Sequence, residues 1–476
     1  MKDIKNNDLK ISCIGAGYVG GPTMAVIADK CPHINVYVLD LNENRIEDWN
    51  SKNPKDFPVF EPGLEEIILR TRGRNLFFTT DIEKNISDSD IVFLSVNTPT
   101  KTSGIGSGRA SDLRWIEKCA RQVADASNGH TIVVEKSTLP VRTASTIKTI
   151  LNSPSKKEDK NGKSFAVLSN PEFLAEGTAI NDLENPDRVL IGGEDKKAIE
   201  TLADIYRNWV DDKKIIRTNL WSSELSKLTA NAFLAQRITS INSVAAICEA
   251  TGADVNEVSR AIGTDTRIGN KFLKSGPGFG GSCFKKDILN LVYLCRFFGL
   301  DEIANYWESV VNLNSWNQNR ITEIVVNKLF GTLAEKKIAL LGFAFKANTN
   351  DTRESSAITI SKNLLIEGAD LKIHDPQVSE KQIAIEIERV FNNELNISFD
   401  KAFPKISYEK VDDIYDAFID ADAIIVATEW EEYSRLDWGK ISGLMRYPAW
   451  VFDTRSIVNK EEVRKTNINL WNIGIG

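Results

Sequence analysis

Apolar residues follow two patterns along this chain: short buried runs in its two ends and a long helical stripe in its middle. The buried runs predict strands in the N-terminal part at 10–13, 36–39, 90–96, 131–134, 165–168 and 189–191, and in the C-terminal part at 338–341, 371–373, 423–427 and 451–455, the last strand. Continuous apolar runs of this length are typical of strands buried on both faces of a parallel sheet. Helical runs such as 23–28 and 355–366 lie between them, so each end is predicted to be a doubly wound α/β half.

The middle of the chain has helical rather than strand periodicity. From Ser222 to about Arg260, apolar residues recur every three or four positions, and further helices follow to about Gly331. This stretch is too long for a helix of a β/α layer. We therefore predict an α/β fold with two doubly wound Rossmann-type domains joined by a central helical domain, divided as 1–220, 221–330 and 331–476. A long apolar helix also favours a homo-oligomer.

Composition narrows the class of protein. With 476 residues, 42% hydrophobic and 26% charged, the chain is typical of a soluble globular protein with two or three domains. A net charge of −7 argues against nucleic-acid or membrane partners. No apolar run is long enough to span a bilayer, and the polar start lacks a signal-peptide core. Six scattered cysteines and three histidines predict no metal site and a reducing, cytoplasmic location. The charged stretch 153–163 is predicted to be a surface loop.

A glycine motif follows the first predicted strand. Gly15, Gly17 and Gly20 form G-x-G-x-x-G ahead of a helix, and the next strand ends at Asp40. This order of strand, glycines, helix, strand and acid predicts dinucleotide binding. Asp40 would bind the ribose diol and repel a 2′-phosphate, which favours NAD over NADP. Arg45 either faces the adenosine or is an ordinary surface charge.

Polar residues also follow other predicted strands, at the sheet edge where ligands bind in such folds. Thr98 follows one strand, and Glu135 and Thr138 follow the next, where they either cap a helix or contact the cofactor. Glu172 and Glu176 lie four residues apart after another strand, where they either face solvent or serve the site.

A glycine-rich stretch, 276–283, ends in Cys283. We expect a loop flexible enough to close on a ligand, with Cys283 at the start of a helix that favours its thiolate and Asp287 on the same helix face. The alternative is a cysteine that is merely a small core residue. Lys227 and Asn231 lie four apart on the central helix, and could equally be a surface pair.

Cysteine together with NAD indicates a particular chemistry. A thiolate adds to an aldehyde to give a thiohemiacetal, which can lose a second hydride and become a thioester that water hydrolyses. The combination therefore predicts a four-electron dehydrogenase that converts a primary alcohol into a carboxylate.

Several longer motifs carry a family resemblance. They are IGAGYVGGPT (14–23), SVNTPTKT (95–102), EKSTLPVR (135–142), SNPEFLAEGTAI (169–180), NPDRVLIGG (185–193), WSSELSKLTANAFLAQR (221–237), GFGGSCFKKDILNLVYLC (278–295) and GFAFKANTNDTRESS (342–356). With these motifs the chain resembles the animal-type branch of the UDP-glucose/GDP-mannose dehydrogenase family, the UDP-glucose 6-dehydrogenases. The resemblance implies oxidation of UDP-glucose to UDP-glucuronate with two NADH, and a hexamer built as a trimer of dimers, with a dimer as the alternative. A dehydrogenase of a UDP-hexosamine or GDP-mannose, or a non-catalytic NAD-sensing module, are the other candidates.

The resemblance also implies roles for individual residues. Cys283 would be the nucleophile, Lys227 and Asn231 would stabilise the oxyanion, and Asp287 would act in the first proton removal. Glu172 would serve thioester hydrolysis, and Thr138 would orient the water. We expect cofactor contacts from Gly15, Gly17, Tyr18, Val19, Gly20, Asp40, Arg45, Val96, Thr98, Glu135, Ser137, Thr138, Glu176 and Arg353. We expect substrate contacts from Glu172, Phe173, Leu174, Lys227, Asn231, Asn270, Phe272, Leu273, Phe279, Gly280, Phe345, Lys346 and Arg455, and from Arg267 toward a neighbouring subunit.

Overall fold

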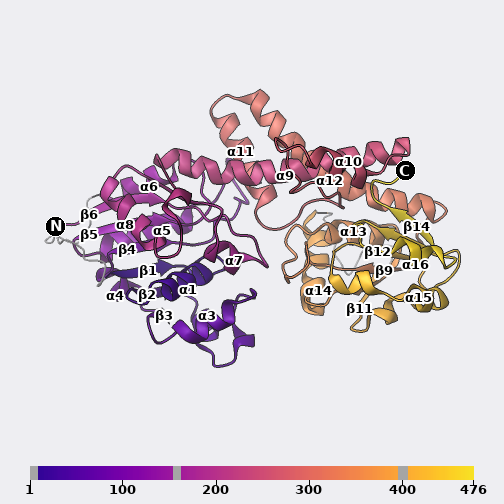
Figure 1. Cartoon of the computed structure of the whole chain (residues 1–476), viewed down its shortest axis with the longest axis horizontal. Coiled ribbons are helices and arrows are strands. Elements are labelled where there is room, and N and C mark those ends of the chain that lie inside the picture. The colour runs from indigo at the N-terminus through magenta and orange to yellow at the C-terminus, as the bar shows by residue number, and fades with distance from the viewer. Residues whose placement is uncertain (1–8, 154–161, 395–405) are drawn as a thin grey trace. The chain divides into compact units, whose positions relative to one another are not determined.

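The computed structural model describes residues 9–153, 162–394 and 406–476, which form two compact units, Met1–Ala230 and Asn231–Gly476 (Figure 1). Each unit contains one sheet, and long helices follow the first sheet along the chain. The predicted fold class of two doubly wound halves and a helical segment is therefore confirmed. The first eight residues and most of the loop predicted at 153–163 lie outside the described residues.

The first unit contains an eight-stranded sheet in the order β3-β2-β1-β4-β5-β6-β7-β8. All neighbours are parallel except β6 and β7. Its first six strands have the order 3-2-1-4-5-6 of dinucleotide-binding folds. The strands are β1 (Lys10–Ile14), β2 (Asn35–Leu39), β3 (Leu76–Thr79), β4 (Ile91–Leu94), β5 (His130–Glu135), β6 (Ser164–Ser169), β7 (Val189–Gly193) and β8 (Ile215–Thr218).

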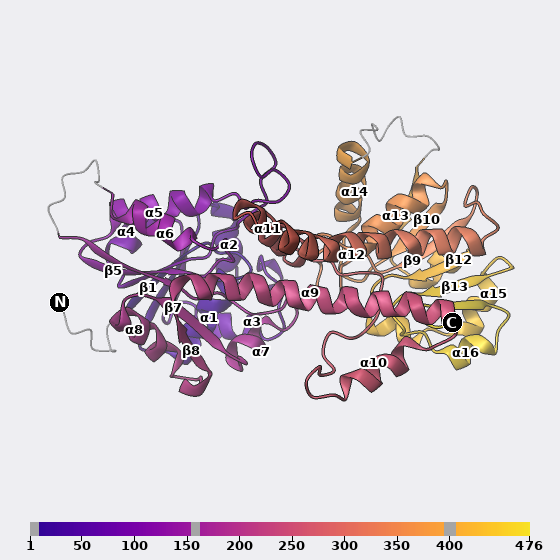
Figure 2. The same cartoon turned by 90° about the horizontal axis from the view of Figure 1, so that it is seen from above.

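Helices cover both faces of this sheet. The helices are α1 (Gly20–Lys30), α2 (Glu43–Asn50), α3 (Leu64–Thr71), α4 (Ile82–Ser87), α5 (Arg114–Ala126), α6 (Thr143–Leu151), α7 (Ala179–Glu184) and α8 (Lys196–Tyr206). Apolar side chains of α1, α3, α7 and α8 share one buried core, and those of α4, α5 and α6 share another. Figure 2 shows these two groups on opposite sides of the strands. The sheet is thus buried on both faces, which explains its continuous apolar strands.

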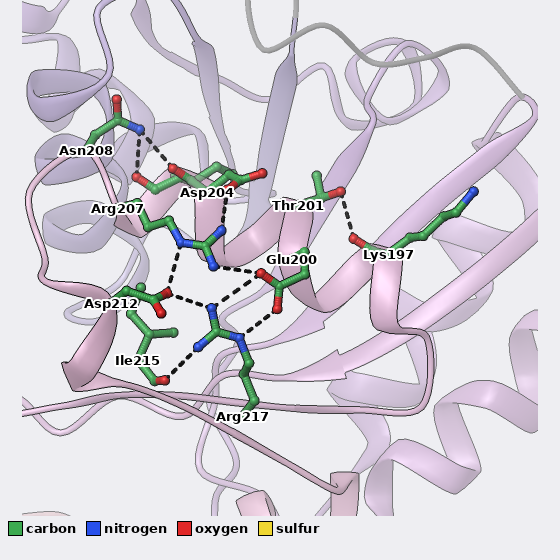
Figure 3. A network of polar contacts seen from close by, with 10 residues as sticks. Lys197, Glu200, Thr201, Asp204, Arg207, Asn208, Asp212, Ile215 and Arg217 are labelled. Carbon is green, nitrogen blue, oxygen red and sulfur yellow. Dashed lines mark hydrogen bonds and ion pairs between the residues drawn. The ribbon is translucent and has the colours of Figure 1, made fainter.

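An exposed network of charges links α8 to the edge strand β8 (Figure 3). Arg217 pairs with Glu200 at 2.6 Å and with Asp212 at 2.7 Å, and Arg207 contacts the same two acids. Hydrogen bonds from Arg217 and Arg207 lower the pKa of the Glu200 carboxyl. Because this network faces water, we expect it to contribute little to the stability of the fold.

The central helices are α9 (Leu220–Thr251), α10 (Val255–Gly263), α11 (Phe284–Phe297) and α12 (Asp301–Lys328). The helical periodicity predicted from Ser222 to about Arg260 is confirmed, and it falls on two helices, α9 and α10. Gly252 adopts a left-handed φ of +82°, and the side chain of Asp254 accepts a hydrogen bond from Asn256 and caps α10. A glycine followed by a capping acid explains this division.

The second unit contains a six-stranded, wholly parallel sheet in the order β11-β10-β9-β12-β13-β14, which repeats the order 3-2-1-4-5-6. Its strands are β9 (Lys337–Leu341), β10 (Asp370–His374), β11 (Ser407–Lys410), β12 (Ala423–Val426), β13 (Trp450–Asp453) and β14 (Asn469–Asn472), and its helices are α13 (Ser356–Ile366), α14 (Glu380–Arg389), α15 (Trp438–Leu444) and α16 (Lys460–Arg464). The prediction that 451–455 is the last strand is wrong, because β14 follows. That strand was missed because it is short and contains only two apolar residues.

The turn after β9 repeats the turn after β1. Gly15 donates its N–H to Leu39 after β1, and Gly342 donates its N–H to His374 after β9. An acid follows the second strand of each sheet, Asp40 in one and Asp375 in the other. Asp375 is buried, and its Oδ2 accepts hydrogen bonds from the N–H groups of Phe343 at 2.7 Å and Ala344 at 3.0 Å. In the second sheet the acid therefore binds the backbone N–H groups of the turn after β9.

Candidate active site

The glycine turn between β1 and α1 is shaped by close backbone approaches. Gly15 has a φ of +111°, and a Cβ there would lie 2.3 Å from the carbonyl oxygen of Ser95. A Cβ on Gly20 would lie 2.0 Å from the carbonyl oxygen of Gly15. No such neighbour lies within 4 Å of the position of a Cβ on Gly17, so the turn is open there. Val19 caps α1. This open turn at a helix start fits the pyrophosphate of a dinucleotide.

Asp40 lies at the end of β2, next to this turn. Its Oδ2 accepts hydrogen bonds from the N–H of Ala16 at 3.0 Å and from the guanidinium of Arg45 at 3.1 Å, and its Oδ1 accepts one from the N–H of Asn42 at 3.0 Å. Of the two alternatives for Arg45, the structure places it against Asp40. A carboxylate has about four acceptor positions, so Asp40 keeps capacity for a ribose hydroxyl.

The loops after β4 and β5 lie against each other. The Ser137 hydroxyl donates to the carbonyl oxygen of Val96 at 2.7 Å, and the Thr98 hydroxyl donates to the carbonyl oxygen of Thr138 at 3.0 Å. The structure therefore brings these four predicted residues together. They lie at the carboxyl edge of adjacent parallel strands, where such folds bind ligands.

Glu135 and Glu224 form a buried pair of carboxyl groups in the first unit. Glu135 ends β5 and Glu224 lies on α9, and their two buried side chains are neighbours. The Glu224 carboxylate also accepts from the N–H groups of Arg142 at 2.7 Å and Ala144 at 2.8 Å. Burial raises the pKa of Glu135 well above its usual range, and the charge of Glu224 raises it further. One proton therefore serves both carboxyl groups, and it is bound to Glu135.

A second buried charge pair joins Glu172 and Lys227. The Lys227 Nζ lies 3.1 Å from Glu172 Oε1, and the two side chains are only 5% and 7% exposed. The other oxygen, Oε2, accepts from the N–H of Leu174 at 3.0 Å. Lys227 also lies 5.4 Å from the centre of the Phe173 ring, which Arg188 covers at 3.8 Å. The first unit thus gathers the predicted residues Glu172, Phe173, Leu174 and Lys227.

Cys283, Asp287 and Asn231 come together in the second unit. Cys283 is the half-buried N-cap residue of α11, and its carbonyl oxygen accepts from the N–H of Asp287 at 2.8 Å. The Asn231 side chain donates to Asp287 Oδ2 at 2.6 Å, and Asp287 is 1% exposed. The Ser282 hydroxyl lies 3.5 Å from the Cys283 sulfur. A thiol at a helix start is placed where the N–H groups and helix dipole stabilise a thiolate.

The glycine loop before Cys283 is packed closely against its surroundings. A Cβ on Gly280 would lie 2.5 Å from the carbonyl oxygen of Glu354, and one on Gly278 would lie 2.9 Å from the Asn314 side chain. Asn314 also exchanges two hydrogen bonds with the backbone of Phe279, at 2.8 and 3.1 Å. The glycines therefore permit close packing, a reason that the prediction of a flexible loop did not include.

A cavity of about 170 Å³ lies in the second unit. It is lined by Ile238, Phe272, Lys274, Ser275, Glu429 and Arg455. The Arg455 guanidinium donates to the carbonyl oxygens of Ala427 at 2.7 Å and Phe345 at 3.3 Å and lies 3.1 Å from Glu429. Lys346 lies 5.5 Å from the centre of the Phe345 ring. The lining carries two cations, Lys274 and Arg455, against one carboxylate, Glu429, together with the Phe272 ring, so it suits an anionic ligand with a flat ring.

Other predicted residues lie apart from these groups. Arg267 is 87% exposed and pairs with Asp265, and Asn270 is exposed, whereas Leu273 is buried. Arg353 pairs with Asp351. In the first unit, Glu176 is half-buried, and the Tyr18 hydroxyl accepts a hydrogen bond from the N–H of Gly177 at 3.3 Å. The roles assigned to these residues stay predictions.

The sequence interpretation missed several residues of these groups. They are Lys136, Asn170, Tyr206, Glu224, Lys274, Ser275 and Glu429. Lys136 and Asn170 directly follow β5 and β6, so the positional signal used for Glu135 and Glu172 could have identified them. The others come from helices and loops distant in the sequence, and no local pattern marks them.

The described ranges, 9–153, 162–394 and 406–476, lack both a metal-ligand cluster and a membrane-spanning helix. No three His, Cys, Asp or Glu side chains in them are grouped to hold a metal ion. Nor does any helix in them have the length and apolar character needed to cross a membrane.

Comparisons with known proteins agree with this arrangement. Models of the UDP-glucose/GDP-mannose dehydrogenase family match residues 9–210 (NAD binding domain), 221–316 (central domain) and 339–460 (UDP binding domain). The chain is 52% identical over 474 residues to UDP-glucose 6-dehydrogenase 4 of Arabidopsis thaliana, covering 98% of this chain and 97% of the relative. It is 54% identical over 454 residues to UDP-glucose 6-dehydrogenase of Gallus gallus, covering 94% and 89%.

Among solved structures, the UDP-glucose dehydrogenase from Pyrobaculum islandicum matches with a TM-score of 0.82 at 29% identity, covering 99% of both chains. These matches span all three parts of the chain. The chain therefore belongs to the UDP-glucose/GDP-mannose dehydrogenase family.

Proposed function

We propose that this chain oxidises UDP-glucose to UDP-glucuronate with NAD, through covalent intermediates on Cys283. The observation that carries the proposal is the start of α11, where a half-buried thiol lies one helical turn before a buried Asp287 held by Asn231. Identities of 52% and 54% to UDP-glucose 6-dehydrogenases over nearly the whole chain support UDP-glucose as the substrate.

The proposed roles follow the reaction in order. NAD, when bound, accepts the hydride in each of the two oxidations. Asp287 serves the first proton removal, which gives an aldehyde. The Cys283 thiolate adds to the aldehyde carbon, and the second oxidation leaves a thioester on its sulfur. Lys227 and Asn231 stabilise the oxyanion. Glu172 takes a proton from water, which attacks the thioester, so that the carboxylate leaves and the thiolate is restored, with Thr138 orienting the water.

The binding residues are proposed in the same way. The turn at Gly15–Gly20, with Asp40, would hold the dinucleotide, while the cavity at Phe272 and Arg455 would hold the uridine diphosphate part of the substrate. An arginine fits phosphate oxygens and an aromatic ring fits a base. We also propose the domain division 1–220, 221–330 and 331–476.

The oligomeric state, the location and the branch of the family are proposals as well. We infer a homo-oligomer, as a hexamer of three dimers or as a dimer, in the cytoplasm. Membership of the animal-type branch stays a proposal as well, because identity to the Gallus gallus protein is 54% and identity to the Arabidopsis thaliana proteins is 52–53%.

Counting NADH per UDP-glucose consumed tests the proposed function. We expect two equivalents and UDP-glucuronate from the wild type. Cys283→Ala should form no UDP-glucuronate while binding NAD normally, because the nucleophile lies outside the dinucleotide turn. Cys295→Ala is the matched control, since Cys295 lies on the same helix and is buried in its core. One NADH per substrate, or UDP-glucuronate formation by Cys283→Ala at a comparable rate, would contradict the covalent route.

A further inference from the structure

Glu249 and Arg320 form a largely buried ion pair in the second unit that none of the proposed roles uses. Arg320 lies on α12, and two nitrogens of its guanidinium bind Glu249 of α9, at 2.7 and 3.1 Å. The Arg320 and Glu249 side chains are only 8% and 16% exposed. Glu249 Oε1 also accepts from the N–H of Gly474 at 2.8 Å. A two-pronged contact with a further backbone bond fixes the guanidinium in one orientation.

The third nitrogen of Arg320 leads to the glycine loop before the proposed nucleophile. Its Nε donates to Asn317 Oδ1 at 2.9 Å, and Asn317 Nδ2 donates to the carbonyl oxygen of Gly276 at 2.9 Å. Asn317 is 1% exposed. Because a guanidinium can only donate, Arg320 holds the oxygen of the Asn317 amide toward itself and leaves the NH2 group for Gly276. Arg320 thus decides how Asn317 meets the loop.

Side-chain amides hold this loop at two points, Gly276 and Phe279. The N–H of Gly276 donates to Asn242 Oδ1 at 2.9 Å, so side chains bind both of its backbone groups. Asn314 binds both backbone groups of Phe279. Buried polar networks whose members all have partners specify one arrangement of the backbone. The arrangement set here is that of the loop which carries the thiol.

We propose that Arg320 is a positioning residue, which acts through Asn317 to fix the loop before Cys283 where that loop meets the substrate. The inference rests on the proposed function, which places substrate contacts and the nucleophile on this one loop. Glu249 supplies the counter-charge that a buried guanidinium requires. A misplacement of about 1 Å at a reacting group can cost about a hundredfold in rate, so such a loop needs firm support.

Arg320→Lys tests the role while keeping the charge. Lysine can pair with Glu249, but its single ammonium group cannot reproduce the fork and also bind Asn317. We expect the Kd for UDP-glucose, measured by calorimetric titration, to rise about tenfold, the effect of one lost hydrogen bond to a charged group. The Kd for NAD should stay constant, because the dinucleotide turn belongs to the first unit. A variant that was merely less stable would lose active molecules and keep both Kd values.

Arg296→Lys is the matched control. Arg296 also joins α11 to α12, through an ion pair with Glu308 at 2.6 Å, but it lies at the opposite end of α11 from Cys283. The same substitution there should leave the Kd for UDP-glucose unchanged.

Asn317→Ala shows whether Arg320 acts through Asn317. If it does, the double variant Arg320→Lys/Asn317→Ala should bind UDP-glucose no more weakly than Asn317→Ala alone, because the second change has nothing left to act on. Asn317→Ala keeps the ion pair with Glu249, so it tests the same link if Arg320→Lys does not fold. Hydrogen exchange of residues 276–283, measured without substrate, should be faster in each variant than in wild type.

Three results would overturn the role of Arg320. They are an unchanged Kd for UDP-glucose in either single variant, losses of affinity that add in the double variant, and unchanged hydrogen exchange of the loop. A wild type that binds no UDP-glucose would instead overturn the proposed function. The exchange measurement needs no substrate, so it would still decide whether Arg320 fixes the loop.

Discussion

Single residues in this protein carry charges that the fold has removed from water. Glu135 and Glu224 share a proton because neither carboxyl group reaches solvent, whereas Glu172 stays close to a cation. The same residue type thus has different charged neighbours in two places of one unit. Burial and the nearest charge decide which form is present.

The Glu135 pair predicts a stability that depends on pH. The pKa of Glu135 is raised in the folded protein. Its contribution to the free energy of unfolding is therefore fully present below the pKa of 4.5 in the unfolded chain, and it is lost as pH rises toward the pKa in the folded protein. Glu135→Gln cannot ionise. Its free energy of unfolding relative to wild type should therefore increase between pH 5 and 8, by at most about 1.4 kcal/mol per pH unit.

Denaturant unfolding of both proteins across this pH range measures the effect. Glu47→Gln, an exposed glutamate on α2, is the control and should show a constant difference. A difference for Glu135→Gln that is equally constant would show that Glu135 holds no proton in this range.

At the scale of elements, the turn between β1 and α1 separates structural from ligand-facing glycines. A Cβ on Gly20 meets backbone at 2.0 Å, whereas a Cβ on Gly17 meets nothing within 4 Å. Backbone cannot move aside as a flexible side chain can. The two positions should therefore respond differently to the same substitution.

Gly20→Ala should lower the stability of the cofactor-free protein by about 1–3 kcal/mol, as overpacking does. Gly17→Ala should leave that stability near wild type but weaken NAD binding, because the added methyl group occupies the open turn. Thermal unfolding without cofactor and calorimetric titration with NAD separate the two effects. A Gly17→Ala variant with unchanged NAD affinity would place the pyrophosphate elsewhere.

The elements also show how far the sequence could predict the fold. The buried apolar runs around Ile11, Val133 and Ile424 identified their strands, because a sheet covered on both faces needs such runs. Edge strands such as β8 and β14 were not predicted, since one side of each lacks a neighbouring strand and their apolar pattern in the sequence is weak. Cys283 and Asp287 were found from helical spacing, but their link to Asn231 depends on tertiary packing that no local pattern encodes.

At the scale of the whole molecule, an apolar surface bears on the proposed oligomer. Five exposed apolar side chains lie where α11 ends and α12 begins, namely Phe297, Phe298, Leu300, Ile303 and Tyr306. Exposed apolar groups of this size commonly mark an interface. A charged substitution among these five side chains is therefore expected to weaken assembly of the oligomer.

Ile303→Asp should shift the protein toward single chains, because a buried unpaired carboxylate at an interface is strongly unfavourable. Light scattering coupled to gel filtration measures the mass. Ile385→Asp is the matched control, since Ile385 is equally exposed on the charged helix α14. A wild-type protein that elutes as single chains would contradict the oligomer, and an Ile303→Asp oligomer of unchanged mass would exclude this surface.

The acid that follows the second strand of each sheet limits how the C-terminal half could be redesigned. Asp375 accepts five hydrogen bonds, from four backbone N–H groups and the indole of Trp430, whereas Asp40 accepts three and remains half-exposed. Grafting the G-x-G-x-x-G motif onto the turn after β9 would therefore not create a second dinucleotide site. The acid there is already fully occupied, and freeing it would dismantle the turn that the new glycines were meant to shape.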